Sequence, residues 1–213
     1  IMSFRKRLVQ FDVDSTFIQQ EVIELLAAKA GVLTQVARIT DSAMRGELDF
    51  AESLIARVAL LSGLSDSVIE QVRAEITLTD GAAELVESLH KNGHSVALVS
   101  GGFANIMQPI VDDLKIDYFR ANTLEIKDGV LTGKVVGPIV DRAAKAQALR
   151  EFALDSQIEL ADTVAIGDGA NDLDMMAIAG ISIAFNAKPI VAEAATYSIT
   201  EPSLASVKSL IDL

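Results

Sequence analysis

Two aspartate motifs, far apart in the chain, each follow directly on an apolar run with the length of a buried strand. The first is DVDST at residues 12–16 and the second is GDGAND at residues 167–172. In open α/β sheets, ligands bind in a crevice at the carboxyl ends of the strands. The two motifs therefore predict a sheet in which carboxylates from distant segments meet at one edge. Hard oxygen ligands gathered in this way suit a shared Mg²⁺, an ion that commonly serves phosphate chemistry.

Outside residues 17–76 the chain alternates between strand patterns and helix patterns. Strands are expected at 7–11, 95–99, 163–166 and 181–185, with a β-hairpin over 124–135. Helices are expected at 81–91, 103–114, 142–153, 171–179, 189–195 and 204–213. Such alternation is typical of a parallel sheet whose two faces are covered by helices. The expected fold class is therefore α/β, with a Rossmann-like three-layer αβα core.

Residues 17–76 break this alternation and carry helical patterns alone. The helical segments are 18–30, 33–44, 49–61 and 66–76. Gly31 falls where a helix C-terminus is expected, and Asp49 is a suitable N-cap. Because this block follows the first strand and precedes the rest of the sheet, we expect an inserted helical-bundle cap at 17–76. The core would then consist of residues 1–16 and 77–213.

Composition argues against several classes of function. The chain has no cysteine, which rules out disulfide scaffolds, thiolate catalysis and cysteine-ligated metal sites. Its formal net charge of −12 argues against a nucleic-acid partner, because such proteins normally present a basic face. No apolar stretch reaches the ~18 residues of a membrane span, and Arg5, Lys6 and Arg7 precede no signal-peptide segment. We therefore expect a cytoplasmic protein without nucleic-acid or membrane partners.

The first motif can supply both a nucleophile and a proton carrier for the hydrolysis of a phosphate monoester. That reaction is extremely slow without a catalyst, because the dianion repels nucleophiles and the departing alkoxide is strongly basic. Asp12 would be ionised at pH 7 and could attack phosphorus to form an aspartyl-phosphate. Asp14 would protonate the leaving oxygen and then accept a proton from the attacking water. That role requires neighbours that raise the pKa of Asp14.

The second motif supplies candidate metal ligands. Asp168 would complete a metal site with Asp12 and the backbone carbonyl of Asp14. Asn171 and Asp172 would orient these ligands.

A phosphate cradle is indicated where the strand at 95–99 ends. Ser100, Gly101 and Gly102 offer a hydroxyl and backbone amides at a point where a helix begins, which suits an anion. Lys145 lies one turn into a later helix and could neutralise phosphoryl oxygens. Each motif by itself is also compatible with an ordinary capped turn or a solvated helix face. Their joint occurrence, mostly at predicted strand ends, indicates one shared active site.

The helical insertion carries a second group of candidate residues. Glu21 could meet a substrate ammonium, and Arg57 could bind a substrate carboxylate in a bidentate manner. Arg57 also lies at the edge of an apolar stripe, where an arginine can extend to water or pair with a structural carboxylate. On spacing alone, Met44 and Phe50 are interpreted as helix-packing residues.

Several motifs occur in a fixed order along the chain. They are FDVDST with Glu21 downstream, RV and LL within 57–61, LVSGGF at 98–103, ANTLEIKDGVLTG…GPIVD leading to Lys145, and VAIGDGANDLDMM at 164–176. In this order and spacing, from Leu8 to about Pro202, the chain resembles the haloacid dehalogenase-like phosphohydrolases. Gln10 departs from the apolar residue that is more usual before the nucleophile.

The resemblance implies a Rossmann-like core with a helical cap, one Mg²⁺ per active site, and hydrolysis of O-phospho-L-serine to L-serine, the last step of serine biosynthesis. It implies that Asp12 is the nucleophile and Asp14 the general acid/base, and that Asp12, Asp14 and Asp168 are the metal ligands. The phosphate would be contacted by Ser100, Gly101, Lys145 and Asn171. The rest of the substrate would be contacted by Glu21, Arg57, Met44 and Phe50. Gly102 and Asp172 would support these residues.

Two alternatives remain open from the sequence. A related enzyme could act on another small phosphomonoester, or could pass the phosphoryl group to another alcohol. A non-catalytic module that binds phosphate or metal could keep the same fold, although binding alone needs no second, proton-carrying carboxylate. We expect a monomer or a homodimer.

Overall fold

A computed structural model of the chain describes residues 5–44 and 47–213, and for Met44 the backbone alone. Within these residues, seven strands form one sheet in the order β4-β3-β2-β1-β5-β6-β7. The strands are β1 (Leu8–Asp12), β2 (Ser95–Phe103), β3 (Tyr118–Lys127), β4 (Val130–Val136), β5 (Thr163–Gly167), β6 (Ile181–Phe185) and β7 (Tyr197–Ile199). All neighbours are parallel except β3 and β4, which form an antiparallel hairpin.

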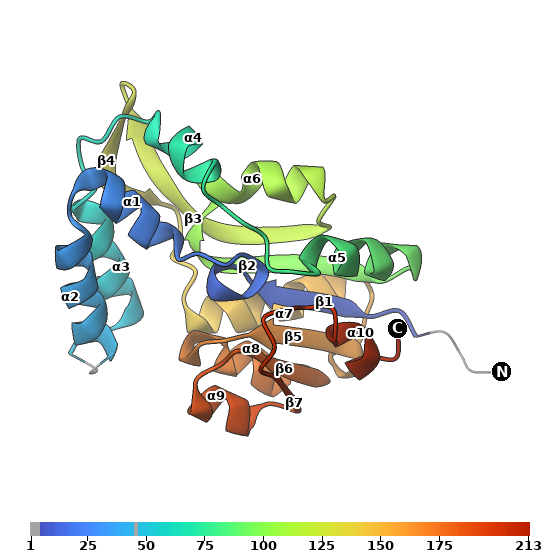
Figure 1. Cartoon of the computed structure of the whole chain (residues 1–213). Coiled ribbons are helices and arrows are strands. Elements are labelled where there is room, and N and C mark those ends of the chain that lie inside the picture. Colours follow the sequence, from blue (N-terminus) through green and yellow to red (C-terminus); the bar gives the residue numbers. More distant parts are fainter. Residues whose placement is uncertain (1–4, 45–46) are drawn as a thin grey trace.

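Helices cover both faces of the sheet, as Figure 1 shows. The core helices are α5 (Ala82–Lys91), α6 (Ala104–Asp113), α7 (Arg142–Asp155), α8 (Leu173–Ile178), α9 (Pro189–Ala194) and α10 (Val207–Leu210). Val9 and Phe11 of β1 pack with apolar residues of α5, α6 and α10, whereas Leu8 packs with those of α7, α8 and α9. Successive side chains of a strand point to opposite faces, so β1 is buried on both. The structure confirms the predicted α/β class.

The register of the central strands brings three strand ends to one edge of the sheet. Asp12 is opposite Val99 of β2, and Phe11 is opposite Ile166 of β5. Parallel strands run in the same direction, so the segments that follow β1, β2 and β5 all begin at this edge.

Four further helices lie beyond this edge, between β1 and α5 in the sequence (Figure 1). They are α1 (Val22–Ala30), α2 (Leu33–Met44), α3 (Phe50–Ala59) and α4 (Val68–Arg73). Helix α1 ends at Gly31, whose φ of 69° is the left-handed conformation that glycine adopts readily. Helix α3 begins with a capping box, in which the Asp49 and Glu52 side chains each accept a backbone N–H at the helix start.

The two connections between this insertion and the sheet lie side by side. Gln19 donates its backbone N–H to the Thr77 carbonyl at 2.9 Å, and Thr79 donates to the Phe17 carbonyl at 2.9 Å. The insertion also contacts the β3–β4 hairpin, where Leu131 donates to the Leu64 carbonyl at 2.8 Å.

Several elements differ from the sequence-based expectation. A π-helical turn occupies Val13–Phe17, and β7 was not predicted at all. Strand β3 begins at Tyr118, earlier than the predicted hairpin, because its first residues pair with β2 despite polar side chains such as Arg120. Helices α4 and α10 are shorter than predicted.

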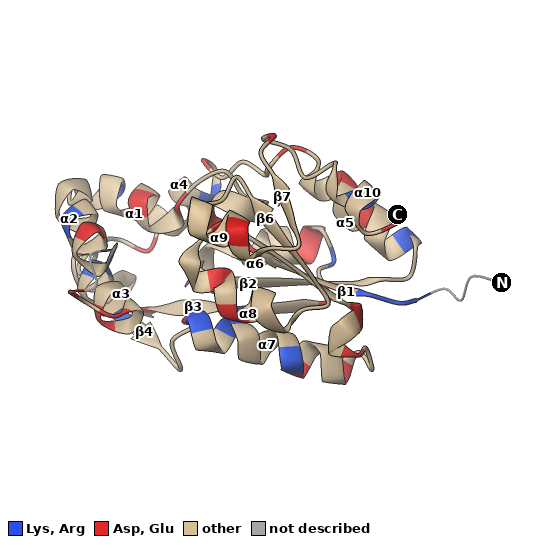
Figure 2. Ribbon diagram, turned by 90° about the horizontal axis from the view of Figure 1, so that it is seen from below, with Lys and Arg blue, Asp and Glu red and all other residues tan. Residues whose placement is uncertain are grey.

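Charged positions are distributed over many elements. In Figure 2, basic and acidic positions are interspersed along the helices of the insertion and of the core. Among the described residues, every helix is too short or too polar to span a lipid bilayer.

Candidate active site

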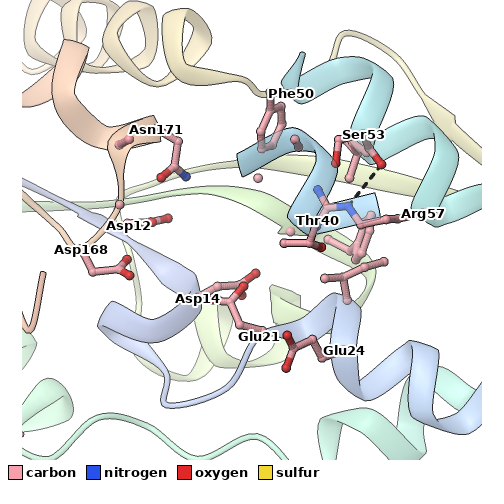
Figure 3. A pocket seen from close by; sticks show the side chains of 18 of the residues that line it. Asp12, Asp14, Glu21, Glu24, Thr40, Phe50, Ser53, Arg57, Asp168 and Asn171 are labelled. Carbon is pink, nitrogen blue, oxygen red and sulfur yellow. Dashed lines mark hydrogen bonds between the residues drawn. The ribbon is translucent and has the colours of Figure 1, made fainter. Parts of the chain in front are cut away.

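A pocket of about 440 Å³ lies at the carboxyl edge of the sheet, between the core and the insertion. Figure 3 shows Asp12, Asp168 and Asn171 on one side of it and residues of α3 on the opposite side. Its lining includes the carboxylates of Asp12, Asp14, Glu21, Glu24 and Asp168 and the cations of Arg57 and Lys188. Carboxylates therefore outnumber cations, and an anionic substrate would need an additional positive charge.

The floor of the site contains a buried ion-pair network around Lys145. Its ammonium contacts Asp12 Oδ1 at 2.6 Å and Asp172 Oδ1 at 2.8 Å, and its side chain is 1% exposed. Burial alone would lower the pKa of Lys145, but the charges of Asp12 and Asp172 outweigh that effect and raise it. Lys145 is therefore cationic, and it places positive charge directly beside Asp12.

Gln10 holds the backbone of this lysine. Its Nε2 donates to the Lys145 carbonyl at 3.1 Å, and the side chain is fully buried between β1 and α7. The polar residue that the sequence left without an interpretation thus links the strand of Asp12 to the helix of Lys145.

Asp14 lies in the π-helical turn, where the chain bends sharply after β1. Ser15 adopts a left-handed φ of 56°, which redirects the chain so that Asp14 faces the pocket. Asp14 Oδ1 is buried and has no hydrogen-bond partner among the described residues. Burial, and then the charge of Glu21, raise the pKa of Asp14 to about 8. A carboxyl group in this environment can carry a proton at neutral pH.

Three carboxylates are close enough to share one cation. Oxygens of Asp12, Asp168 and Asp172 all lie within 4.8 Å of one another. Both oxygens of Asp172 already accept hydrogen bonds, from Lys145 and from the backbone amides of Asp168 and Gly169. This leaves one oxygen each on Asp12 and Asp168, which no hydrogen bond reaches within the described part of the chain.

These free oxygens fit a hard divalent cation such as Mg²⁺. Asp172 instead holds Lys145 and the 168–169 turn in place, as a supporting residue. Burial, followed by the charge of Asp172, raises the pKa of Asp168 to about 6. A cation at this position would relieve the repulsion between the carboxylates.

The segment at Ser100–Gly102 lies next to Asp14. The pairing of β2 with β3 is interrupted between Val99 and Phe103, so this segment leaves the regular ladder. Ser100 is fully buried, and its Oγ accepts the Gly102 N–H at 2.8 Å. A side chain on Gly102 would meet Asp14 Oδ2 and Ser100 Oγ at 3.0 Å each. The glycine therefore keeps space open between the two groups.

The insertion contributes the other end of the pocket. Phe50 covers Gly101 so closely that a Cβ there would lie 2.8 Å from its ring. Arg57 donates from Nε to the Ser53 carbonyl at 3.2 Å (Figure 3). Its terminal nitrogens make no ion pair among the described residues and remain available to a ligand. Glu21 accepts a hydrogen bond from the Ser15 hydroxyl at 2.5 Å.

The structure thus brings together most of the residues that the sequence singled out. Asp12, Asp14, Glu21, Phe50, Arg57, Gly101, Gly102, Asp168 and Asn171 all line the pocket, and Ser100, Lys145 and Asp172 are buried beneath it. Met44 ends α2, but its side chain is outside the described part of the structure.

Sequence reasoning missed other lining residues. Those with a polar or charged side chain are Glu24, Thr40, Ser53 and Lys188. Thr16, which does not line the pocket but donates to Asp168, was also missed. Ser53 lies three residues after Phe50 and four before Arg57, so helical spacing alone places it on their face. No comparable pattern identifies Lys188.

Curated relatives are similar in sequence to almost the whole of this chain. The phosphoserine phosphatase of Streptococcus thermophilus is 52% identical over 211 residues, which are 99% of this chain and 98% of that protein. The phosphoserine phosphatase of Streptomyces coelicolor is 55% identical over 208 residues, which are 98% of this chain and 51% of that protein. The chain therefore spans about half the length of the first curated relatives it matches.

A solved structure and a family model also match this chain. A solved structure described as a phospho-aspartyl intermediate analogue of phosphoserine phosphatase matches with a TM-score of 0.91 and 43% identity. The match covers 97% of this chain and 99% of that one. Residues 9–177 match the haloacid dehalogenase-like hydrolase family. This chain belongs to the haloacid dehalogenase-like hydrolases.

Proposed function

We propose that this chain hydrolyses O-phospho-L-serine to L-serine and phosphate, with Asp12 as the nucleophile and Mg²⁺ as the cofactor. One observation carries the proposal: a single pocket joins the carboxylates of Asp12 and Asp14 to the guanidinium of Arg57. One end suits chemistry on a phosphoryl group, and the other suits recognition of a charged amino acid. The relatives named phosphoserine phosphatase support this choice of substrate.

Binding would place the phosphoryl group between Ser100 and Asp12. The Ser100 hydroxyl, the amide of Gly101, the Asn171 side chain and the Lys145 ammonium would contact its oxygens. A Mg²⁺ ion held by Asp12, Asp168 and the backbone carbonyl of Asp14 would neutralise charge on the same oxygens.

In the first step, an oxygen of Asp12 attacks phosphorus. A bond forms between this oxygen and phosphorus, and the bond from phosphorus to the seryl oxygen breaks. Asp14 gives its proton to the seryl oxygen, so serine leaves as a neutral alcohol. The unpartnered Oδ1 of Asp14 and its raised pKa support this assignment.

In the second step, water attacks the phosphorus of the aspartyl-phosphate. Asp14, now ionised, accepts a proton from this water, and the bond between Asp12 and phosphorus breaks. Phosphate is released, Asp12 is regenerated and Asp14 is protonated again, so the cycle is balanced. Residues 17–76 would act as a cap that excludes bulk water during both steps and opens for product release.

The test of this function is phosphate release from a substrate panel. With Mg²⁺ present, kcat/KM should be highest for phosphoserine, lower for phosphothreonine and lowest for a sugar phosphate. A chelator should abolish release, because the carboxylate-rich pocket would then repel the phosphoryl dianion. Preference for the sugar phosphate, or undiminished release in chelator, would contradict the proposal.

A binding readout separates loss of the cation from damage to the enzyme. Mg²⁺, which Asp12 and Asp168 would hold, should raise the Tm of the wild-type protein, since a ligand bound only by the native state stabilises it. This shift should be much smaller in Asp168→Asn, which loses the negative charge of one of the carboxylates that would hold the ion.

Arg57 should determine selectivity for an amino-acid substrate. Arg57→Ala removes the guanidinium that would bind the carboxylate, so kcat/KM for phosphoserine should fall about 10²-fold. Turnover of p-nitrophenyl phosphate, which has no carboxylate, should change much less.

Two further variants make this comparison specific. Arg57→Lys keeps the charge but loses the planar fork, and it should recover only part of the selectivity. Arg150→Ala, an exposed arginine of α7 outside the pocket, should behave as wild type. Equal losses on both substrates in Arg57→Ala would remove Arg57 from amino-acid recognition.

A further inference from the structure

Helix α3 presents one continuous face to the pocket. Phe50, Ser53, Leu54 and Arg57 all line the pocket, at the spacing of residues that share one side of a helix. Figure 3 shows Ser53 beside Arg57, on the opposite side of the pocket from Asp12 and Asp168. This face carries two apolar side chains, one guanidinium group and one hydroxyl group.

The hydroxyl of Ser53 is buried without a hydrogen-bond partner. The residue is 1% exposed, and its Oγ makes no hydrogen bond within the described residues. A buried hydroxyl without a partner destabilises the folded protein, because its hydrogen bonds to water are lost and none replaces them. Thr40, another hydroxyl of the pocket lining, instead donates to the Val36 carbonyl at 3.1 Å. Of Thr40 and Ser53, only Ser53 therefore has a hydroxyl that is free to bind a ligand.

We propose that the Ser53 hydroxyl donates a hydrogen bond to the substrate carboxylate that Arg57 binds. The inference deepens the proposed function and rests on it. Arg57 and Ser53 are already coupled, because Arg57 Nε donates to the Ser53 carbonyl at 3.2 Å. Rotation about one side-chain bond moves the hydroxyl between staggered positions, so it can turn toward a ligand without backbone movement.

Of the three charged groups of the substrate, the carboxylate is the one that would lie near Ser53. The phosphoryl group would lie at the far end of the pocket, beside Asp12 and Lys145. The ammonium would lie near the carboxylates of Glu21 and Glu24, which Figure 3 places together away from Ser53. The carboxylate is the group that the guanidinium of Arg57 would draw to α3.

The experiment compares Ser53→Ala with wild type on two substrates. O-phosphoethanolamine keeps the phosphate and the ammonium of phosphoserine but lacks its carboxylate. In Ser53→Ala, kcat/KM for phosphoserine should fall about tenfold through a higher KM, as expected for loss of one hydrogen bond to a charged group. For phosphoethanolamine, kcat/KM should stay within about twofold of wild type.

Stability supplies an independent readout. Ser53→Ala removes an unpartnered polar group, so the Tm of the substrate-free protein should equal or exceed that of wild type. Ser206→Ala is the matched control, because Ser206 at the start of α10 also has a buried hydroxyl with no partner among the residues that the structure describes, but does not line the pocket. It should leave both kcat/KM values unchanged.

The outcomes separate this inference from the proposed function. An equal loss on both substrates, no loss on either, or a lowered Tm in Ser53→Ala would overturn the role of Ser53 while the enzyme still hydrolyses phosphoserine. Failure of the wild-type protein to hydrolyse phosphoserine would overturn the proposed function and this inference together.

Discussion

Replacing Asp12 by asparagine should reduce phosphate release from phosphoserine by roughly 10⁴-fold or more, since loss of a catalytic nucleophile removes the covalent route. The amide of asparagine keeps the shape of the carboxylate, but it is a poor nucleophile toward phosphorus. The measurement is steady-state phosphate release with saturating Mg²⁺. A variant that keeps wild-type kcat would refute the assignment of Asp12.

The fold of this variant should survive. Lys145 keeps Asp172 as a partner at 2.8 Å when Asp12 becomes neutral. Asp12 Oδ1 accepts the Val13 N–H at 2.7 Å and lies 2.6 Å from Lys145 Nζ, and the amide oxygen of asparagine can make both contacts. Asp12→Asn should therefore keep the Tm of wild type within a few degrees. Asp174→Asn, in the same motif as Asp168 but paired with Arg142 at the surface, should retain full activity.

Replacing Lys145 by methionine should destroy activity and also lower stability strongly. The change leaves Asp12 and Asp172 buried together without their shared cation. Removal of one partner from a buried ion pair typically destabilises by about 3–5 kcal/mol, which corresponds to a fall in Tm of roughly 10 °C in a domain of this size. One of the two carboxylates would take up a proton, and a protonated Asp12 cannot attack phosphorus.

A double variant separates the two effects of Lys145. Lys145→Met combined with Asp172→Asn removes one of the opposed carboxylates, so much of the lost Tm should return in chelator. Activity should not return, because the cation that would contact the phosphoryl group is still missing. Recovery of both properties would show that Lys145 is needed for stability alone.

The sequence was sufficient to predict the core of the fold. Strands β1, β2, β5 and β6 each contain a short, mostly apolar run, and β1 and β5 end at aspartate and glycine, so they can be recognised without knowledge of tertiary contacts. The meeting of Asp12 with Asp168 followed from one rule, that parallel strands share a carboxyl edge. Their separation in space, within 4.8 Å, agrees with that expectation.

Other features depend on contacts that sequence patterns do not contain. The turn at Val13–Phe17 requires a left-handed Ser15, a conformation that no composition rule assigns to serine. Strand β7 has three residues and exists because β6 offers it a free edge. The roles of Gln10 and Ser53 depend on which hydrogen bonds are made or missing, and these can be counted only in three dimensions.

The paired connections of the insertion have a consequence for how such a chain can change. The backbone leaves the core after Phe17 and returns to it at Thr79, and these two residues are hydrogen-bonded to each other. Helices of another size or shape could be joined at this junction without altering strand order or moving the carboxylates at the sheet edge. Substrate range and bond-breaking chemistry are thus encoded in separable stretches of polypeptide, and one can diversify while the other stays constant.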